Sequence, residues 1–243
     1  MNEKKTALVT GANKGIGFET ARQLAQQGIT VLLGARDEQR GAEAATKLRD
    51  EGLDVRFLQL DLSDEKTYET AAKLIAQEFG RLDILVNNAG VNEDYTTPAS
   101  QTTLEQWRKT FETNVFSLIA LTQKLLPLIK KAEAGRIVNL SSSMGSLTLN
   151  SDPNQPFGAD GSSTSYSASK AAVNMFTVHL ANELKDTPIK VNAADPGWVK
   201  TEMGGENAHL EVEDGAKTSV ALATLPAAGD TGKYYHFDEE LPW

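Results

Sequence analysis

The segment Thr10–Gly17 reads TGANKGIG and joins two unlike patterns. It follows the apolar run Thr6–Thr10, which predicts a strand, and it opens the amphipathic run Gly15–Gln27, which predicts a helix. Glycines between a strand and a helix permit a tight turn, and the helix N-terminus offers free N–H groups to a phosphate. The spacing G-x-x-x-G-x-G therefore predicts a phosphate-binding turn, although a plain glycine-rich connection has the same composition.

Apolar runs of strand length alternate with longer helical patterns along the rest of the chain. Strands are predicted at Thr6–Thr10, Thr30–Leu33, Val55–Leu60, Leu82–Val86, Arg136–Leu140, Ile189–Ala194 and Tyr234–Phe237. Helices are predicted at Gly15–Gln27, Glu38–Asp50 with Asp37 as N-cap, Glu65–Phe79, Leu104 to about Lys131, Ser165–Leu184 and Glu213–Leu225. Pro127 is expected to kink or break the long helix. The alternation predicts an α/β fold, a doubly wound parallel sheet with helices on both faces.

Length and composition narrow the class of protein. The 243 residues suit one domain, residues 1–243, because no linker-like stretch divides them. The net charge of −9 argues against a nucleic-acid or anionic-membrane partner. The absence of cysteine excludes disulfides and thiolate zinc sites, and the three histidines show no metal spacing. No apolar stretch reaches the roughly 18–20 residues of a membrane helix, so a cytoplasmic protein with no membrane partner is expected.

Three segments do not fit the alternating pattern. Val91–Thr103, Ser143–Thr164 and Trp198–Val212 follow the fourth, fifth and sixth predicted strands. In parallel α/β sheets, ligands bind beyond the carboxyl ends of the strands, and long irregular loops there are more often functional than idle. These three segments are therefore expected to form the substrate pocket.

Several motifs occur in one order along the whole chain. They are TGANKGIG, Asp61, NNAG at Asn87–Gly90, Ser142, YSASK at Tyr166–Lys170 and the pair Pro196-Gly197. This order resembles the short-chain dehydrogenase/reductase family, and GANKGIG, GARDEQRG and EGLDVRFLQLDL are most similar to its NADPH-dependent carbonyl reductases. The resemblance implies a Rossmann-like fold and NADP(H) as the cofactor.

The resemblance also implies which residues contact the cofactor. They are Gly11, Asn13, Lys14, Gly15, Ile16, Gly17, Arg36, Asp61, Leu62, Asn88, Ala89, Gly90, Tyr166, Lys170, Pro196, Gly197, Val199 and Thr201. Asn87 is similar to the residue that steadies the sheet, and Trp198 either walls the substrate pocket or only packs.

The choice between NADP and NAD depends on the end of the second strand. NAD sites place a carboxylate there, whereas an NADP site uses arginine to hold the extra phosphate. Arg36 occupies this position, Lys14 can reach the same phosphate, and Arg40 can assist. Asp37 is the complication, because a carboxylate at the ribose would make NAD tolerable.

The implied catalytic residues are Asn114, Ser142, Tyr166 and Lys170. Tyr166 and Lys170 are four positions apart and share one helix face, so the ammonium is expected to lower the pKa of the tyrosine for proton transfer. Ser142 is expected to hold the carbonyl oxygen, with the neighbouring serines at 141 and 143 as alternatives. Asn114 is similar to the residue that marks a helix kink and supports a proton relay, and a buried, backbone-satisfied Asn is the alternative.

The interval between Ser142 and Tyr166 is longer than in typical members of the family. Pro153, Pro156, Gly158 and Gly161 discourage a long helix there. Inserts at this place make some carbonyl reductases monomeric, so the choice between monomer and homo-oligomer stays open, as does whether Phe157 lines the pocket or blocks a partner.

The sequence thus predicts an NADPH-dependent oxidoreductase that interconverts a small ketone or aldehyde and its alcohol. An NAD-dependent alcohol or polyol dehydrogenase is the alternative within enzymes. A dinucleotide-binding regulator without turnover is the alternative outside them. The substrate itself is not indicated.

Overall fold

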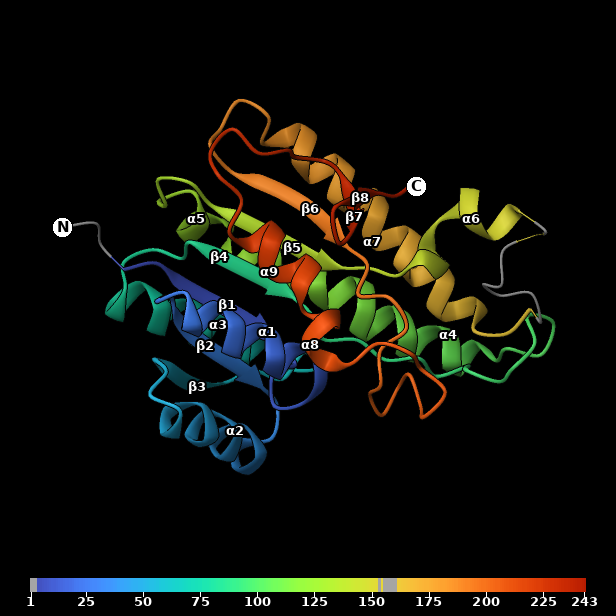
Figure 1. Cartoon of the computed structure of the whole chain (residues 1–243), viewed down its shortest axis with the longest axis horizontal. Helices are drawn as coiled ribbons and strands as arrows, with labels where there is room; N and C mark the ends of the chain where they lie inside the picture. The colour runs from blue at the N-terminus through green and yellow to red at the C-terminus, as the bar shows by residue number, and fades with distance from the viewer. Residues whose placement is uncertain (1–3, 153, 155–160) are drawn as a thin grey trace.

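The computed structural model describes residues 4–152, 154 and 161–243, and Figure 1 shows a sheet between two layers of helices. The strands are β1 Thr6–Thr10, β2 Thr30–Ala35, β3 Val55–Gln59, β4 Ile84–Asn87, β5 Arg136–Leu140, β6 Lys190–Ala194, β7 Tyr234–His236 and β8 Glu239–Glu240. The main helices are α1 Gly15–Gln26, α2 Glu38–Asp50, α3 Glu65–Glu78, α4 Leu104–Phe111, α5 Ser117–Ile129, α6 Leu147–Ser151, α7 Thr164–Glu183, α8 Val212–Gly215 and α9 Lys217–Ala223.

Within the described residues, the sheet has the order β3-β2-β1-β4-β5-β6-β7-β8. All neighbours from β3 to β7 are parallel, and β8 pairs antiparallel with β7. The strand order reverses between β1 and β4, which places a crevice beyond their carboxyl ends. The predicted doubly wound parallel sheet is confirmed, and the short β8 is an addition to it.

Each face of the sheet has its own hydrophobic core. One face packs against α1, α2 and α9 through residues such as Leu24, Leu48 and Val220. The other packs against α3, α5 and α7 through residues such as Ile75 and Leu125. The central strands are buried on both faces, which explains why their sequences are continuously apolar rather than alternating.

The long helix expected from Leu104 is divided by a π-helical turn, η1 Glu112–Phe116. The backbone N–H of Ser117 bonds to Glu112 O, five residues back, instead of four. α5 continues through Pro127 to Ile129, so the expected break at Pro127 is wrong. Pro127 lacks the N–H that would bond to the preceding turn, and it lies in the last turn of α5, so only two helical residues follow the missing bond.

Two further expectations about elements need correction or restriction. The helix expected at Glu213–Leu225 is two shorter helices, α8 and α9, separated at Ala216. Gly215, the last residue of α8, packs so closely on Val199 that a Cβ would lie 2.5 Å from Val199 Cγ2. Among its described residues, the insert after β5 contains the 3-10 turn η2 Ser143–Gly145 and the five-residue α6. Phe157, Pro153, Pro156 and Gly158 lie outside the described residues.

No helix in the described ranges is both long enough and apolar enough to cross a membrane.

Candidate active site

The glycine turn after β1 meets the loop after β4 at the point where the strand order reverses. The backbone N–H groups of Asn88 and Ala89 both bond to Thr10 Oγ1 at 3.0 Å. Gly11 has φ of +63°, and a Cβ on Gly17 would lie 2.4 Å from Asn88 Nδ2. Glycine is therefore needed at both positions, at Gly11 for its backbone conformation and at Gly17 for close approach.

The first turn of α1 has the features of a phosphate site. Lys14 is the N-cap residue, and its side chain makes no capping bond. Gly15 has φ of +56°, and a Cβ there would lie 3.5 Å from Thr201 Cγ2, so the loop after β6 reaches this turn. Ile16 packs on the hydrophobic core and anchors the helix start. Backbone donors of a twelve-residue helix thus face an open crevice, which fits a dinucleotide pyrophosphate.

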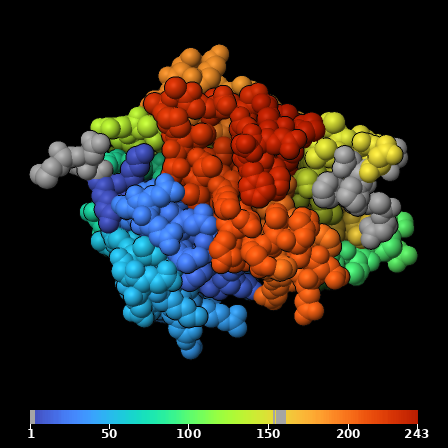
Figure 2. Space-filling view, in the orientation of Figure 1, coloured from blue at the N-terminus to red at the C-terminus, as the bar shows by residue number. Residues whose placement is uncertain are grey.

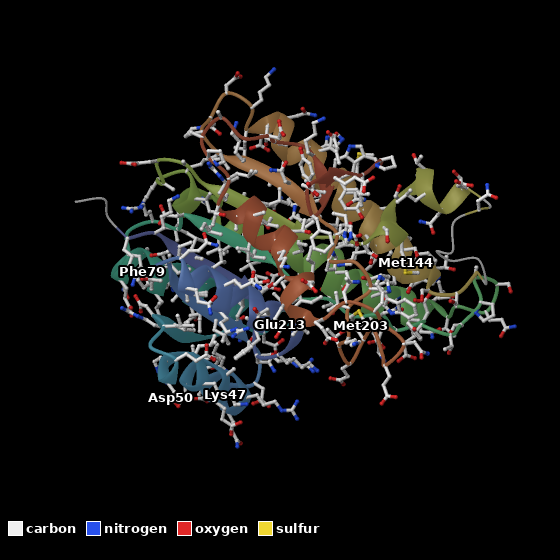
Figure 3. The ribbon with its side chains drawn as sticks, viewed as in Figure 1. Lys47, Asp50, Phe79, Met144, Met203 and Glu213 are labelled. Atoms are coloured by element: carbon white, nitrogen blue, oxygen red, sulfur yellow. The ribbon has the colours of Figure 1, made fainter. Side chains whose placement is uncertain are left out.

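A surface cavity of about 390 Å³ lies between this turn and α2. It is lined by Asn13, Lys14, Phe18, Arg40, Glu43, Ala44 and Lys47. Three of these side chains are cations and one is an anion, which suits a phosphate group. Lys47, which Figure 3 labels on α2, was not among the residues expected from the sequence. Lys47 lies one turn after Glu43 on the same face of α2, and this spacing is the sequence feature that indicates its place in the cavity.

The residues at the end of β2 separate into two roles. Arg36 follows the strand directly and is exposed. Asp37 caps α2, as predicted, because its Oδ1 accepts a 2.8 Å bond from Arg40 N. Lys14 pairs with Glu202 in this structure rather than standing free, but both side chains are mostly exposed, so the pair is easily exchanged.

The loop after β3 is shaped by short hydrogen bonds. Ser63 N and Oγ donate to Asp61 Oδ1 at 2.9 and 2.7 Å, and these bonds, together with the Arg36 charge, lower the pKa of Asp61. Leu62 O accepts a 2.6 Å bond from the Tyr68 hydroxyl. These bonds fix the loop where the charge of Arg36 acts on Asp61, and the contact of Asp61 and Leu62 with the cofactor stays a prediction.

The NNAG segment connects the crevice to the catalytic residues. Asn87 Nδ2 donates to Thr122 Oγ1 and Asn139 Oδ1, both at 2.9 Å, and so ties β4 to α5 and β5. A Cβ on Gly90 would lie 3.3 Å from Asn114 Oδ1 and 3.5 Å from Lys170 Nζ. The structure therefore brings the NNAG loop and two predicted catalytic residues, Asn114 and Lys170, together.

The three serines after β5 have different surroundings. Ser141 is buried, and its Oγ donates a 2.6 Å bond to Asn174 Oδ1. Ser143 uses its backbone N–H to bond Asp195 Oδ1 at 3.1 Å. Ser142 is half-buried, its Oγ accepts a 3.3 Å bond from Met144 N, and its hydroxyl acts on Tyr166 to lower the pKa of that phenol. Among the three, Ser142 is the serine whose hydroxyl meets the predicted acid.

Tyr166 and Lys170 lie in the first two turns of α7, as their spacing predicts. Lys170 is 3% exposed, its Nζ donates a 2.8 Å bond to Leu140 O, and it lies 5.5 Å from the centre of the Tyr166 ring. Burial lowers the pKa of Lys170 to about 8, an effect that the negative charge of Asp195 opposes.

The expected lowering of the tyrosine pKa by the lysine is wrong for this structure. The pKa of Tyr166 is raised to about 12, mainly by burial of the phenol; the Ser142 hydroxyl opposes this rise and the charge of Asp195 adds to it. The ammonium of Lys170 is directed to Leu140 O, so desolvation of the phenol dominates. Tyr166 therefore keeps its proton at neutral pH, which suits a proton donor.

Asn114 lies within the π-helical turn and is 1% exposed. Its Oδ1 accepts from Val91 N at 2.8 Å, and its Nδ2 donates to Val91 O at 2.9 Å and to Ser169 Oγ at 3.0 Å. The side chain is fully used as a clamp between the loop after β4 and α7. The irregular turn leaves the helix one residue wider at the point that faces the catalytic residues.

The loop after β6 closes the other side of the crevice. Gly197 has φ of +73°, and a Cβ there would lie 2.6 Å from Leu210 Cδ1, so Pro196-Gly197 forms a turn that only glycine allows. Val199 is buried, and Thr201 Oγ1 accepts a 3.1 Å bond from Gly204 N. Figure 2 shows this orange segment lying against the blue N-terminal region, and Gln23 on α1 bonds to the backbone O of Glu213, which Figure 3 labels.

Trp198 remains 43% exposed at the surface of this loop. Its Nε1 donates to Gly204 O at 2.8 Å, and its ring meets the edge of His209 at 6.0 Å between centroids. These contacts show that Trp198 packs within the loop, and its place in the wall of the substrate pocket stays a prediction.

Two buried carboxylates were missed by sequence reasoning. Asp94, fully buried, accepts a 2.7 Å bond from Ser165 N and so caps α7, whose N-cap residue Ser163 makes no side-chain cap. Asp195, 5% exposed, lies beside His236, with Oδ2 and Nδ1 3.3 Å apart. No sequence pattern near the start of α7 indicates that Asp94 caps this helix, because Asp94 belongs to a loop that is distant in the chain.

The short chain dehydrogenase family model matches residues 5–211. "Carbonyl reductase [NADPH] 1" of Rattus norvegicus is 34% identical to this chain over 100% of this chain and 99% of the relative. "Short-chain dehydrogenase/reductase 1" of Saponaria officinalis is 33% identical over 99% of this chain and 97% of the relative.

Solved structures give the same result. The NADPH-bound carbonyl reductase from chicken fatty liver has a TM-score of 0.86 and 28% identity, covering 99% of each chain. Salutaridine reductase from Papaver somniferum has a TM-score of 0.84 and 32% identity, covering 96% of this chain and 99% of that one. With a parallel sheet, a glycine turn at its reversal point and a partly buried Tyr166 next to the buried Lys170, this chain belongs to the short-chain dehydrogenase/reductase family and is similar to its carbonyl reductases.

Proposed function

We propose that this enzyme reduces a small ketone or aldehyde to an alcohol with NADPH, and runs the reverse reaction with NADP⁺. The cofactor is NADP(H), as the carbonyl reductase relatives and the basic surroundings of the glycine turn indicate. The observation that carries the proposal is the meeting of Ser142, Tyr166 and Lys170 beside the glycine turn and the NNAG loop.

The binding residues divide by the part of the cofactor that they would hold. The turn from Gly11 to Gly17 takes the pyrophosphate at the N-terminus of α1. Arg36, Lys14 and Arg40 face the extra phosphate on the adenosine ribose, where the cavity beside α2 adds Lys47. Asp61 and the NNAG loop border the adenosine, and the loop from Pro196 to Thr201 borders the nicotinamide end.

Each catalytic side chain has one task in this proposal. The bound NADPH supplies a hydride to the carbonyl carbon. Tyr166 then donates its phenolic proton to the oxygen, and Ser142 holds that oxygen through its hydroxyl. Lys170 binds the ribose at the nicotinamide end of the cofactor through its ammonium, which the bond to Leu140 O holds in place. Asn114 holds the NNAG loop against α7 so that these groups keep their places.

The experiment is NADPH consumption against a panel of aldehydes, ketones, quinones and diketones, repeated with Tyr166→Phe. Removal of the proton donor is expected to lower kcat at least about 100-fold on every substrate accepted by the parent. Tyr68→Phe is the matched control, because it removes a buried phenol that bonds to the loop after β3. Parental rates in Tyr166→Phe would contradict the mechanism.

Two other functions are separated by the same assay. An NAD-dependent alcohol or polyol dehydrogenase would prefer NADH, and Asp37 would have to hold the ribose instead of capping α2. A regulator without turnover would bind NADPH and reduce nothing in the panel.

A further inference from the structure

Asp195 is the last residue before the Pro196-Gly197 turn, and its carboxylate connects two loops of the site. Its Oδ1 accepts a 3.1 Å bond from Ser143 N, the residue next to Ser142. Its Oδ2 lies 3.3 Å from Nδ1 of His236. The Asp195 side chain is 7% exposed, so these protein groups replace most of its contact with water.

His236 holds the carboxylate from the other side. Its Nδ1 also lies 3.2 Å from the backbone O of Asp195, while Asp195 N donates a 2.8 Å bond to Tyr235 O. The ring covers Gly197, where a Cβ would lie 2.8 Å from His236 Cε1, and it contacts the Phe237 ring at 4.3 Å between centroids. The imidazole therefore contacts both the carboxylate and the turn expected to receive the nicotinamide.

The charges around this pair come from three elements. Tyr166 and Lys170 on α7 and Tyr234 on β7 are subject to the field of Asp195, which raises the pKa of each. Glu239 on β8 faces His236, and it acts with Asp195 to raise the pKa of the imidazole against the effect of burial. The buried ammonium of Lys170 thus has Asp195 as an opposing charge that favours its protonated form.

We infer that Asp195 and His236 are a pair of positioning residues for carbonyl reduction. Asp195 fixes the serine loop through Ser143 N and keeps Lys170 charged, and His236 fixes Asp195 and seats the Pro196-Gly197 turn. The inference rests on the proposed function, since it assigns these residues a task in that reaction. Neither residue touches the reacting atoms in this assignment.

The test compares Asp195→Asn and His236→Gln with the matched control Glu239→Gln, which removes an exposed charge near the imidazole. Asn keeps an oxygen for Ser143 N and loses the charge, so the alkaline limb of kcat/KM for NADPH is expected to move down by about one pH unit. We expect kcat to fall about 10- to 100-fold in Asp195→Asn, with less change in KM for NADPH. Glu239→Gln should leave kcat and the alkaline limb as in the parent.

A second measurement tests the interaction between Asp195 and His236 without catalytic turnover. In a proton NMR titration, the His236 resonance is identified by its loss in His236→Gln. Its pKa is expected above the ordinary value of about 6.5 in the parent and at or below that value in Asp195→Asn. Circular dichroism and the unfolding midpoint of each variant show whether the fold is kept.

The outcomes separate this inference from the proposed function. A parental pH profile and kcat in Asp195→Asn, or an ordinary imidazole pKa in the parent, overturns the pairing. Equal losses of stability and activity without a shift of the alkaline limb also overturn it, because they indicate a structural role alone. If Tyr166→Phe keeps parental activity, the proposed function fails, whereas the titration still reports on Asp195 and His236.

Discussion

Lys170 Nζ donates a 2.8 Å hydrogen bond to the backbone O of Leu140, the last residue of β5. The bond fixes the second turn of α7 to the carboxyl edge of the sheet. It also explains why the ammonium stays inside a site that disfavours charge, since a carbonyl dipole and the charge of Asp195 both stabilise it. Burial still leaves the pKa of Lys170 at about 8, close enough to neutrality to be seen in a pH profile.

The first prediction concerns that profile. For kcat/KM of NADPH, which reports on the free enzyme, we expect a plateau at neutral pH and a tenfold loss per pH unit above about pH 8. The cause is loss of the Lys170 proton. Lys170→Arg keeps a charge that does not titrate in this range, so its residual activity should lack this limb. A parental plateau that extends to pH 10 would contradict the assignment.

The site residues that belong to local sequence patterns are predictable from the sequence. Those that depend on contacts between distant parts of the chain are not. Tyr166 and Lys170 are four residues apart in one helix, and the glycine turn joins one strand to the next helix. Both features are local in the chain, so the sequence predicts where they lie. Asp94 and His236 reach their partners across long stretches of chain, and no local pattern marks them. The tyrosine pKa was misjudged because burial depends on the packed structure and not on the spacing to the lysine.

The second prediction concerns cofactor choice. Arg36→Asp is expected to raise KM for NADPH about 10- to 100-fold, because a charge-assisted bond to phosphate is replaced by repulsion. KM for NADH should change much less. The matched control is Arg56→Asp, an exposed arginine on β3 that pairs with Glu78, for which both KM values should stay as in the parent. Steady-state kinetics with both cofactors decide, and equal changes in the two KM values would refute the role of Arg36.

The third prediction concerns the cap of the catalytic helix. Asp94→Ala leaves the buried Ser165 N–H without its 2.7 Å partner, so the free energy of unfolding is expected to fall by about 1–2 kcal/mol. kcat should fall as well, because Tyr166 lies in the first turn of α7. Urea unfolding and steady-state kinetics measure the two effects.

Two further variants control that prediction. Asp94→Asn keeps an acceptor oxygen and should lose less stability than Asp94→Ala. Glu93→Ala removes the exposed neighbouring carboxylate and should leave the unfolding free energy nearly as it was. Equal stability of Asp94→Ala and the parent would show that the cap is energetically unimportant.

The last prediction concerns stability and pH. The hydrogen bond and charge of Asp195 raise the pKa of His236 in the folded protein. A raised folded pKa means that the stabilisation is full below the ordinary imidazole pKa of about 6.5 and is lost as pH rises through the folded value. The parent should therefore exceed His236→Gln in unfolding free energy most clearly near pH 6, by about 1–2 kcal/mol. The difference should shrink toward pH 9. Asp195→Asn, which removes the carboxylate that faces the imidazole, should weaken this pH trend. A difference that grows with pH would reverse the sign of the linkage and rule out the Asp195–His236 ion pair as its source.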